Sequence, residues 1–126
     1  MREGSISSSK DMTAADKAAL IAEFADDMKA ERIETLDVRK KTSVMEMLVV
    51  CTGTSDTHVS SIADRVEEKL RERGVRALRS QTGPTANGWC LYDFGDVVFH
   101  VMLEEKRQFY DLETLWRTIQ DDPNLV

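Results

Sequence analysis

An almost uninterrupted apolar run from Val44 to Cys51 (VMEMLVVC) constrains the fold of this chain more than any other feature. A half-exposed strand alternates apolar and polar residues, whereas a strand covered on both faces is apolar throughout. The turn GTSD follows the run. After it comes a helical pattern of apolar residues at i, i+3, i+4, i+7 and i+11, namely Val59, Ile62, Ala63, Val66 and Leu70. The run therefore predicts the central strand of a sheet that is packed by helices.

Patterns on either side of this run predict the remaining elements. Thr13 and Asp16 resemble a capping box for a first helix that ends near Ala30, and Asp111 can cap a last helix. Gly95 can take a positive φ in a tight turn between two strands. Strands are predicted at residues 33–38, 44–51, 75–78, 89–93 and 97–103. We expect an α/β fold, a mixed five-stranded sheet packed by helices in the order α-β-β-α-β-β-β-α, with one βαβ crossover and otherwise antiparallel strands.

Length and composition indicate one domain in a reducing compartment. The chain has 126 residues, of which 41% are hydrophobic, enough for a single core. We expect this domain at 13–120, a disordered N-terminal tail at 1–12 and a C-terminal tail at 121–126. Cys51 and Cys90 lie in predicted strands without metal-ligand spacing, so neither a metal site nor a cofactor is predicted. No apolar stretch is long enough to span a membrane, and the predicted location is the cytoplasm.

The charge balance bears on the class of partner. The formal net charge is −6. Nonspecific nucleic-acid binding needs clustered Lys and Arg, so this class is disfavoured, and no direct sequence-specific nucleic-acid binding is predicted. An acidic surface instead favours a basic protein partner.

Two acidic turns could carry chemistry, and each has a structural alternative. GTSD, at residues 53–56, joins a strand to a helix, where anions bind, but Ser55 or Asp56 as a helix cap is the favoured interpretation. Asp93 and Asp96 flank the tight turn and offer few ligands to a cation, while Asp commonly bonds turn backbone. His100 lies inside an apolar strand and is interpreted as a satisfied, partly buried ring.

Seven of the eight aromatic residues lie between Trp89 and Trp116. A domain of this size cannot bury all seven equally, so some are expected at a contact surface. Trp116 falls on the apolar stripe of the last helix and is expected in the core. Phe94, at the tip of the tight turn, together with Trp89 and Tyr110, is expected to be exposed.

The segments LDVRKKTS, VVCTGTSDTHVSSIADRVEEKL and WCLYDFGDVVFHVMLEEKRQFYDLETLW resemble the ribosomal silencing factor, or Iojap, family. The resemblance covers about residues 14–116. It implies a fold similar to the nucleotidyltransferase superfamily without its catalytic carboxylates, and a protein that is not an enzyme. It also implies a translational repressor that binds the large ribosomal subunit through ribosomal protein L-fourteen, blocks joining of the small subunit when nutrients are scarce, and forms a homodimer when free.

Carried over residue by residue, the resemblance implies a partner-binding surface, which in our prediction comprises Trp89, Phe94, Met102, Arg107 and Tyr110. The alternative hypothesis is a nucleotidyl- or phosphotransferase that uses the GTSD turn as a phosphate cradle, with Asp93 and Asp96 on a metal ion. The two hypotheses assign function to different groups. The first relies on exposed aromatic rings, and the second on carboxylates and backbone amides.

Overall fold

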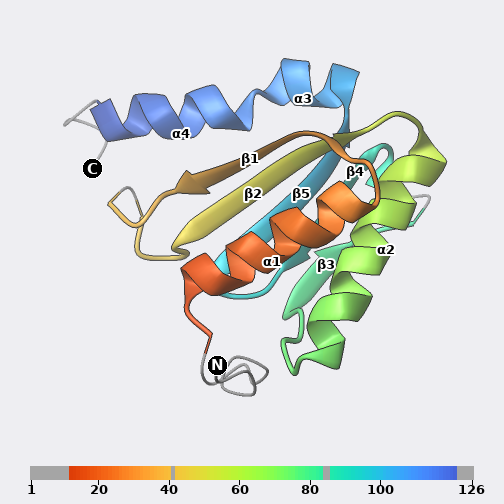
Figure 1. The fold of residues 1–126 in the computed structure, drawn as a ribbon. Coiled ribbons are helices and arrows are strands. Elements are labelled where there is room, and N and C mark those ends of the chain that lie inside the picture. Colours follow the sequence, from red (N-terminus) through yellow and green to blue (C-terminus); the bar gives the residue numbers. More distant parts are fainter. Residues whose placement is uncertain (1–11, 41, 84–85, 122–126) are drawn as a thin grey trace.

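A computed structural model describes residues 12–40, 42–83 and 86–121 (Figure 1). Along the chain the elements are α1 (Ala14–Asp27), β1 (Glu31–Asp37), β2 (Met47–Gly53), α2 (Asp56–Glu72), β3 (Arg79–Gln81), β4 (Trp89–Asp93), β5 (Val97–Leu103), α3 (Glu104–Tyr110) and α4 (Leu112–Asp121). Within these ranges no helix is both long and apolar enough to cross a bilayer.

The five strands form one mixed sheet in the order β1-β2-β5-β4-β3. β2 and β5 pair in parallel, with Met47 opposite Val97 and Gly53 opposite Leu103. The other neighbours, β1 with β2, β4 with β5 and β3 with β4, are antiparallel. The predicted mixed five-stranded α/β sheet is therefore confirmed.

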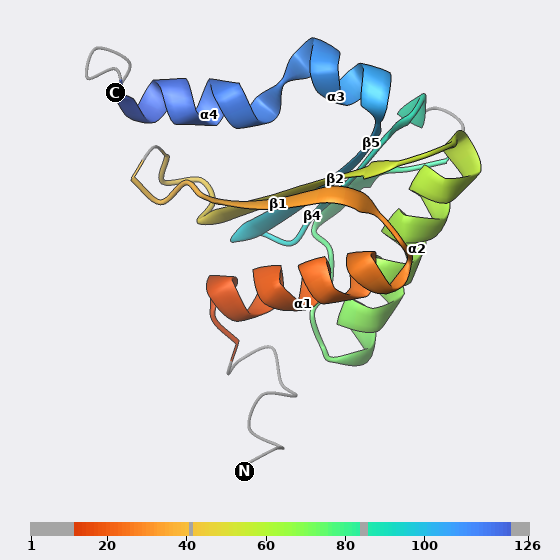
Figure 2. The same ribbon diagram turned by 45° about the horizontal axis from the view of Figure 1, so that its top comes forward.

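Helices cover the sheet on both faces, as the apolar run in β2 predicts. Figure 2 shows α1 and α2 below the sheet and α3 and α4 above it. Val49 and Cys51 of β2 point toward α1 and α2 and join the main core. Leu48 and Val50 point the other way and join a second cluster, against which Trp116 of α4 is half-buried. β2 is thus buried on both faces, with every residue from Leu48 to Gly53 buried.

Local signals set the ends of the first two helices. Thr13 and Asp16 form the expected capping box at the start of α1. The Ser55 hydroxyl caps α2 by accepting a hydrogen bond from the backbone N–H of His58. Gly74 follows α2 with a φ of +84°, the left-handed conformation expected where a helix ends at glycine.

Two elements differ from the predictions. The short strand predicted at 75–78 lies instead at Arg79–Gln81. Val75 is instead bonded to the last turn of α2, because its N–H donates to the carbonyl of Leu70, and its side chain is buried. α3 was not predicted, since its sequence EEKRQFY lacks an apolar stripe. The predicted tails at 1–12 and 121–126 lie outside the described residues, except for Met12, which is buried in the main core, and Asp121, the last residue of α4.

Candidate partner-binding site

Three aromatic side chains meet where β5 passes into α3, and we call Trp89, Phe109 and Tyr110 the aromatic corner. The Trp89 and Tyr110 rings lie with their centroids 4.7 Å apart and inclined by 48°. Phe109 meets Tyr110 edge-on at 4.9 Å. Phe109 is 80% exposed and Tyr110 46%, while Trp89 is half-buried. Such amphipathic rings, partly packed and partly open, are the residue types that most often anchor protein interfaces.

A buried histidine lies against Trp89. The indole Nε1–H donates to Nδ1 of His100 across 2.9 Å, with the ring centroids 5.8 Å apart. His100 is on β5, opposite Leu91 and two residues before Met102, the register partner of Trp89, and is therefore the diagonal neighbour of Trp89 on the same face of the sheet. Burial lowers the pKa of its imidazole to about 4. The ring is consequently neutral at pH 7 and has a lone pair on Nδ1 for the indole. The interpretation of His100 as a satisfied, buried ring is confirmed.

Arg107 holds the segment that carries Phe109 and Tyr110. Its side chain is only 1% exposed. Nη1 donates to the carbonyl of Arg32 at 2.6 Å and to the Thr52 hydroxyl at 3.0 Å. Nε and Nη2 both donate to Oε2 of Glu113, at 2.9 and 2.7 Å. One guanidinium thereby joins α3 to β1, β2 and α4, and fixes the corner on the sheet.

A left-handed residue separates the two helices at this point. Asp111 ends α3 with a φ of +43°, and its N–H donates to the carbonyl of Arg107. The chain turns here and resumes as α4, whose Leu112 packs on the second cluster. Tyr110 is therefore the last residue before a bend, which leaves its ring beside Trp89.

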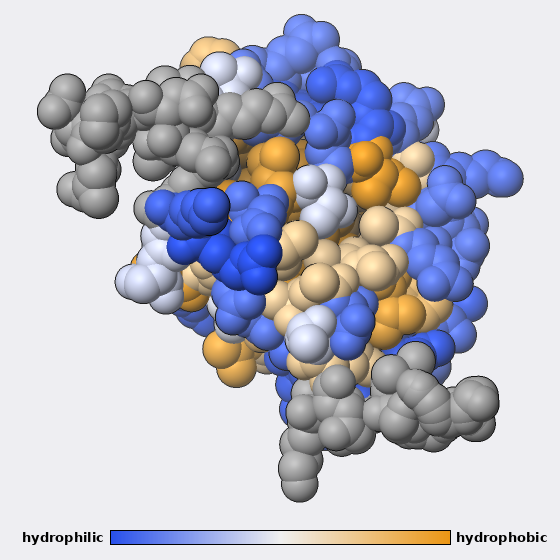
Figure 3. All heavy atoms as spheres, turned by 60° about the vertical axis from the view of Figure 1, so that its left-hand side comes forward, coloured by the Kyte–Doolittle hydropathy of each residue, from blue (hydrophilic) through white to orange (hydrophobic). Residues whose placement is uncertain are grey.

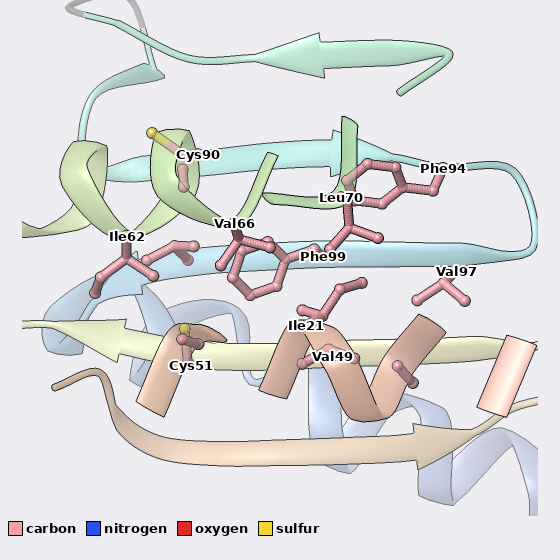
Figure 4. Packing of buried hydrophobic residues seen from close by; sticks show 14 of the residues in the cluster. Ile21, Val49, Cys51, Ile62, Val66, Leu70, Cys90, Phe94, Val97 and Phe99 are labelled. Carbon is pink, nitrogen blue, oxygen red and sulfur yellow. The ribbon is translucent and has the colours of Figure 1, made fainter. Parts of the chain in front are cut away.

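The expectation that Phe94 is exposed at the turn is wrong. Its side chain is 5% exposed and belongs to the main core. The ring stacks on Tyr92, with centroids 6.1 Å apart, and Figure 4 shows it beside Leu70 of α2. Gly95 takes a φ of +96° and the N–H of Phe94 donates to the carbonyl of Val97. The turn thus folds its aromatic residue under the end of α2 instead of toward solvent.

Met102 and Arg107 are also inaccessible. Met102 is fully buried in the second cluster, directly opposite Trp89 in register. Of the five residues predicted to bind the partner, only Trp89 and Tyr110 present surface, and Phe94, Met102 and Arg107 are buried. Phe109, which the prediction left out, is the most exposed ring of the group. Its place after a run of polar residues was the available signal.

Another apolar area lies at the opposite end of the sheet. Figure 3, viewed from the left-hand side of Figure 1, shows apolar side chains gathered there among charged ones. The connection between β1 and β2 runs along this end, and its Val44 is 78% exposed. Val44 precedes the first residue of β2, whereas Trp89 pairs with the end of β5 that continues into α3. The two areas are therefore separated by the length of the central strands.

The GTSD turn is explained by packing and capping. A Cβ on Gly53 would lie 2.7 Å from Cγ2 and 2.8 Å from the backbone nitrogen of Val59, so the glycine permits close approach of α2. The N–H of Thr54 donates to Nδ1 of His58 at 2.9 Å, and Nε2 of the same ring lies 2.8 Å from the carbonyl of Met28. These contacts account for the turn as the start of a helix.

The two aspartates at the hairpin each have a protein partner. Asp93 accepts from the N–H of Gly95 at 2.8 Å and pairs with Arg79 at 2.9 Å. Asp96 pairs with Lys17 of α1 at 3.1 Å. These partners match the structural alternative, in which Asp residues bond the turn and its neighbours.

A polar hollow lies between α2 and the segment before β4. Its lining includes Asp56, Ser60, Asp64, Asn87 and Cys90. Asp64 accepts from the Tyr92 hydroxyl at 3.3 Å, and burial raises the pKa of the Cys90 thiol, which keeps it protonated. Among the described residues, no three His, Cys, Asp or Glu side chains are placed to hold a metal ion.

Comparisons with known proteins identify relatives over most of the chain. The family model described as "Ribosomal silencing factor during starvation" matches residues 11–125. "Ribosomal silencing factor RsfS" of Chromobacterium violaceum is 42% identical over 97 residues, which cover 77% of this chain and 79% of that protein. The protein of the same name from Bacillus subtilis is 35% identical over 97 residues, covering 77% of this chain and 81% of the relative.

A solved structure agrees with the fold. The crystal structure of a Chromobacterium violaceum protein superposes with a TM-score of 0.79 at 40% identity, covering 83% of this chain and 87% of the other. The relatives are named as silencing factors and not as enzymes, which fits the prediction of a protein without catalysis.

Proposed function

Because the chain belongs to the ribosomal silencing factor family, and is thus a ribosome-associated translation regulator, we propose that its aromatic corner binds the large ribosomal subunit. In this proposal the contact is made to ribosomal protein L-fourteen. The bound protein then blocks joining of the small subunit sterically and lowers translation when nutrients are scarce.

The observation that carries the proposal is the packing of Trp89 against Tyr110. The two rings contact each other at 4.7 Å, yet Tyr110 remains 46% exposed. Each ring has a buried residue close by in the fold: Met102 lies directly opposite Trp89 on β5, and Arg107 precedes Tyr110 by three residues in α3. Rings that are already ordered lose little conformational entropy on binding, so their buried area contributes more fully to affinity. Phe94 has no place in this surface because it is buried in the main core.

Charge supports a basic partner. The net charge of the chain is −6. Glu105 and Asp111 are both exposed on the segment that carries Phe109 and Tyr110. Acidic side chains at the rim of an aromatic contact steer a basic protein and speed its association, more than they add to affinity.

Co-sedimentation with purified large subunits tests the contact. Tyr110→Ala and Trp89→Ala are each expected to weaken binding about 10-fold or more, the range of truncated anchor residues. The matched control is Val44→Ala, which removes an exposed apolar side chain at the opposite end of the sheet and is expected to bind like the wild type. Wild-type binding by both corner variants would contradict the proposal.

The identity of the partner and the block of subunit joining are tested separately. Isolated ribosomal protein L-fourteen is expected to retain the wild-type chain and to release Tyr110→Ala. Mixing purified subunits, followed by light scattering, is expected to show less joining as the wild-type protein is added, and normal joining with Tyr110→Ala. Undiminished joining at saturating wild-type protein would refute the block while leaving the binding claim standing.

The proposal includes a homodimer in the free state and a cytoplasmic location. Light scattering coupled to gel filtration is expected to give twice the chain mass of 14.3 kDa. A single-chain mass at micromolar concentration would rule out the dimer. Fractionation with an antibody to the native protein tests the location.

A further inference from the structure

The Trp89 side chain needs a group that fixes its orientation. Trp89 begins β4 directly after a loop, it is half-buried, and its indole N–H needs a hydrogen-bond partner wherever the ring packs. An indole at such a position can rotate about χ1 and χ2 unless something else holds it. The ring is nevertheless in contact with Tyr110 at 4.7 Å.

The group that meets the indole N–H is His100, at 2.9 Å. His100 lies in the middle of β5, the strand that pairs with both β2 and β4, and faces Val50 on one side and Leu91 on the other. Its own position is therefore set by two hydrogen-bonded neighbours of the sheet. Its side chain is 8% exposed, so little solvent competes for the hydrogen bond.

We propose that His100 is a positioning residue: by accepting the indole N–H, it fixes Trp89 against Tyr110 and so orders the aromatic corner before the partner arrives. The inference rests on the proposed function, since it assigns a purpose to the order of a surface that binds the ribosome. His100 itself does not touch the partner in this proposal, because its side chain is only 8% exposed.

The chemistry of the acceptor is specific. Only an unprotonated Nδ1 can accept the N–H, which places the ring proton on Nε2. An asparagine side chain at the same Cβ can place its amide oxygen near the position of Nδ1, whereas leucine has similar bulk and no acceptor. His100→Asn therefore preserves the proposed role and His100→Leu removes it.

The first test observes Trp89 without any partner. The chain has two tryptophans, so Trp116→Phe leaves Trp89 as the single indole. In this background the indole ¹H–¹⁵N resonance and its relaxation report the hydrogen bond and the mobility of the ring. We expect an ordered, hydrogen-bonded indole with His100 and His100→Asn, and a mobile one with His100→Leu. An indole that stays ordered in His100→Leu overturns the inference.

The second test couples the two residues in binding. Large-subunit affinity is expected to fall roughly 3- to 10-fold in His100→Leu, the cost of immobilising one side chain on binding, and to recover in His100→Asn. In a Trp89→Phe background, His100→Leu is expected to have no further effect, because no indole remains to position. An equal loss in both backgrounds overturns the inference.

The outcomes also separate this inference from the proposed function. Amide spectra of each variant show whether the fold is retained. If the spectrum of His100→Leu shows an unfolded protein, His100→Phe, which has a ring of similar bulk and no acceptor, is tested in its place. If the indole loosens but affinity is unchanged while Tyr110→Ala still weakens binding, the positioning role fails and the docking surface stands. If neither Tyr110→Ala nor Trp89→Ala weakens binding, the proposed docking surface is refuted, whatever the His100 variants show.

Discussion

Arg107 and Glu113 form a buried ion pair in which two guanidinium nitrogens, Nε and Nη2, share one carboxylate oxygen at 2.9 and 2.7 Å. Their side chains are only 1% and 8% exposed. The second oxygen, Oε1, is buried without a hydrogen-bond partner among the described residues. The pair lies on either side of the bend at Asp111 and joins α3 to α4, so the aromatic corner depends on it.

Neutralising one member of this pair is expected to destabilise the protein. Glu113→Gln keeps the shape but leaves the Arg107 charge uncompensated, and the expected loss is about 3–5 kcal/mol in the free energy of unfolding. Urea denaturation measures it. Glu67→Gln, at an exposed ion pair with Arg71 on α2, serves as the control and is expected to leave the midpoint unchanged. The double variant Arg107→Met/Glu113→Leu is expected to be more stable than either single change, and a sum of the two losses would contradict this account.

His100 makes stability depend on pH. Its pKa is about 4 in the folded protein against an ordinary 6.5, because burial disfavours the charged ring. Between these values the unfolded chain binds more protons than the folded one, so stability falls as pH falls through this window. From pH 7.5 to pH 5 the expected loss from this group is about 2 kcal/mol. The difference between wild type and His100→Asn, measured by urea denaturation at both pH values, isolates it. Equal pH dependence in the two proteins would contradict the prediction.

Phe94 is expected to matter for stability and not for docking. Phe94→Ala leaves a cavity in the main core beside Tyr92 and Leu70, with an expected cost of about 3–5 kcal/mol. Phe109→Ala, at a ring 80% exposed, is the matched control and is expected to change the thermal midpoint little. A midpoint that falls more for Phe109→Ala than for Phe94→Ala would reverse the assignment of the two rings.

Gly53 is expected to tolerate no side chain. In Gly53→Ala the new Cβ meets the backbone nitrogen of Val59 at 2.8 Å, so α2 must move away from the sheet, at an expected cost of about 1–3 kcal/mol or more. Val59→Ala in addition is expected not to restore stability, because it removes Cγ2 but leaves the nitrogen in place. Calorimetry of the single and double variants measures both effects, and full recovery in the double variant would show that the backbone contact is harmless.

Periodicity predicted the layers of this fold because it reports which faces are buried. The apolar run before GTSD predicted a strand covered on both faces, and β2 is buried between the two layers of helices. That property depends on the sequence of one strand alone. The parallel pairing of β2 with β5 depends on two segments at once, and no local pattern records it.

The errors at the candidate site have the same origin. Arg107 was predicted to lie on the partner-binding surface. Its guanidinium is instead buried against Arg32, Thr52 and Glu113, which are far from it in the chain or beyond a bend. The prediction for Phe94 followed the general rule that turn residues are exposed, but the end of α2 covers its ring. Trp89 and Tyr110 were identified correctly as accessible rings, since a strand start and a helix end rarely bury an aromatic residue completely.

The pairing of β2 with β5 has a consequence for how the protein folds during its synthesis. Met47 pairs with Val97, so fifty residues must be synthesised after the first residue of β2 before its central neighbour exists. Until then β2 can pair with β1 along one edge but lacks its neighbour on the other edge, and the closure of so long a loop slows folding. In a nascent chain the apolar strand β2 therefore keeps one unpaired edge until β5 has been synthesised, and an open apolar edge is the kind of surface that chaperones bind.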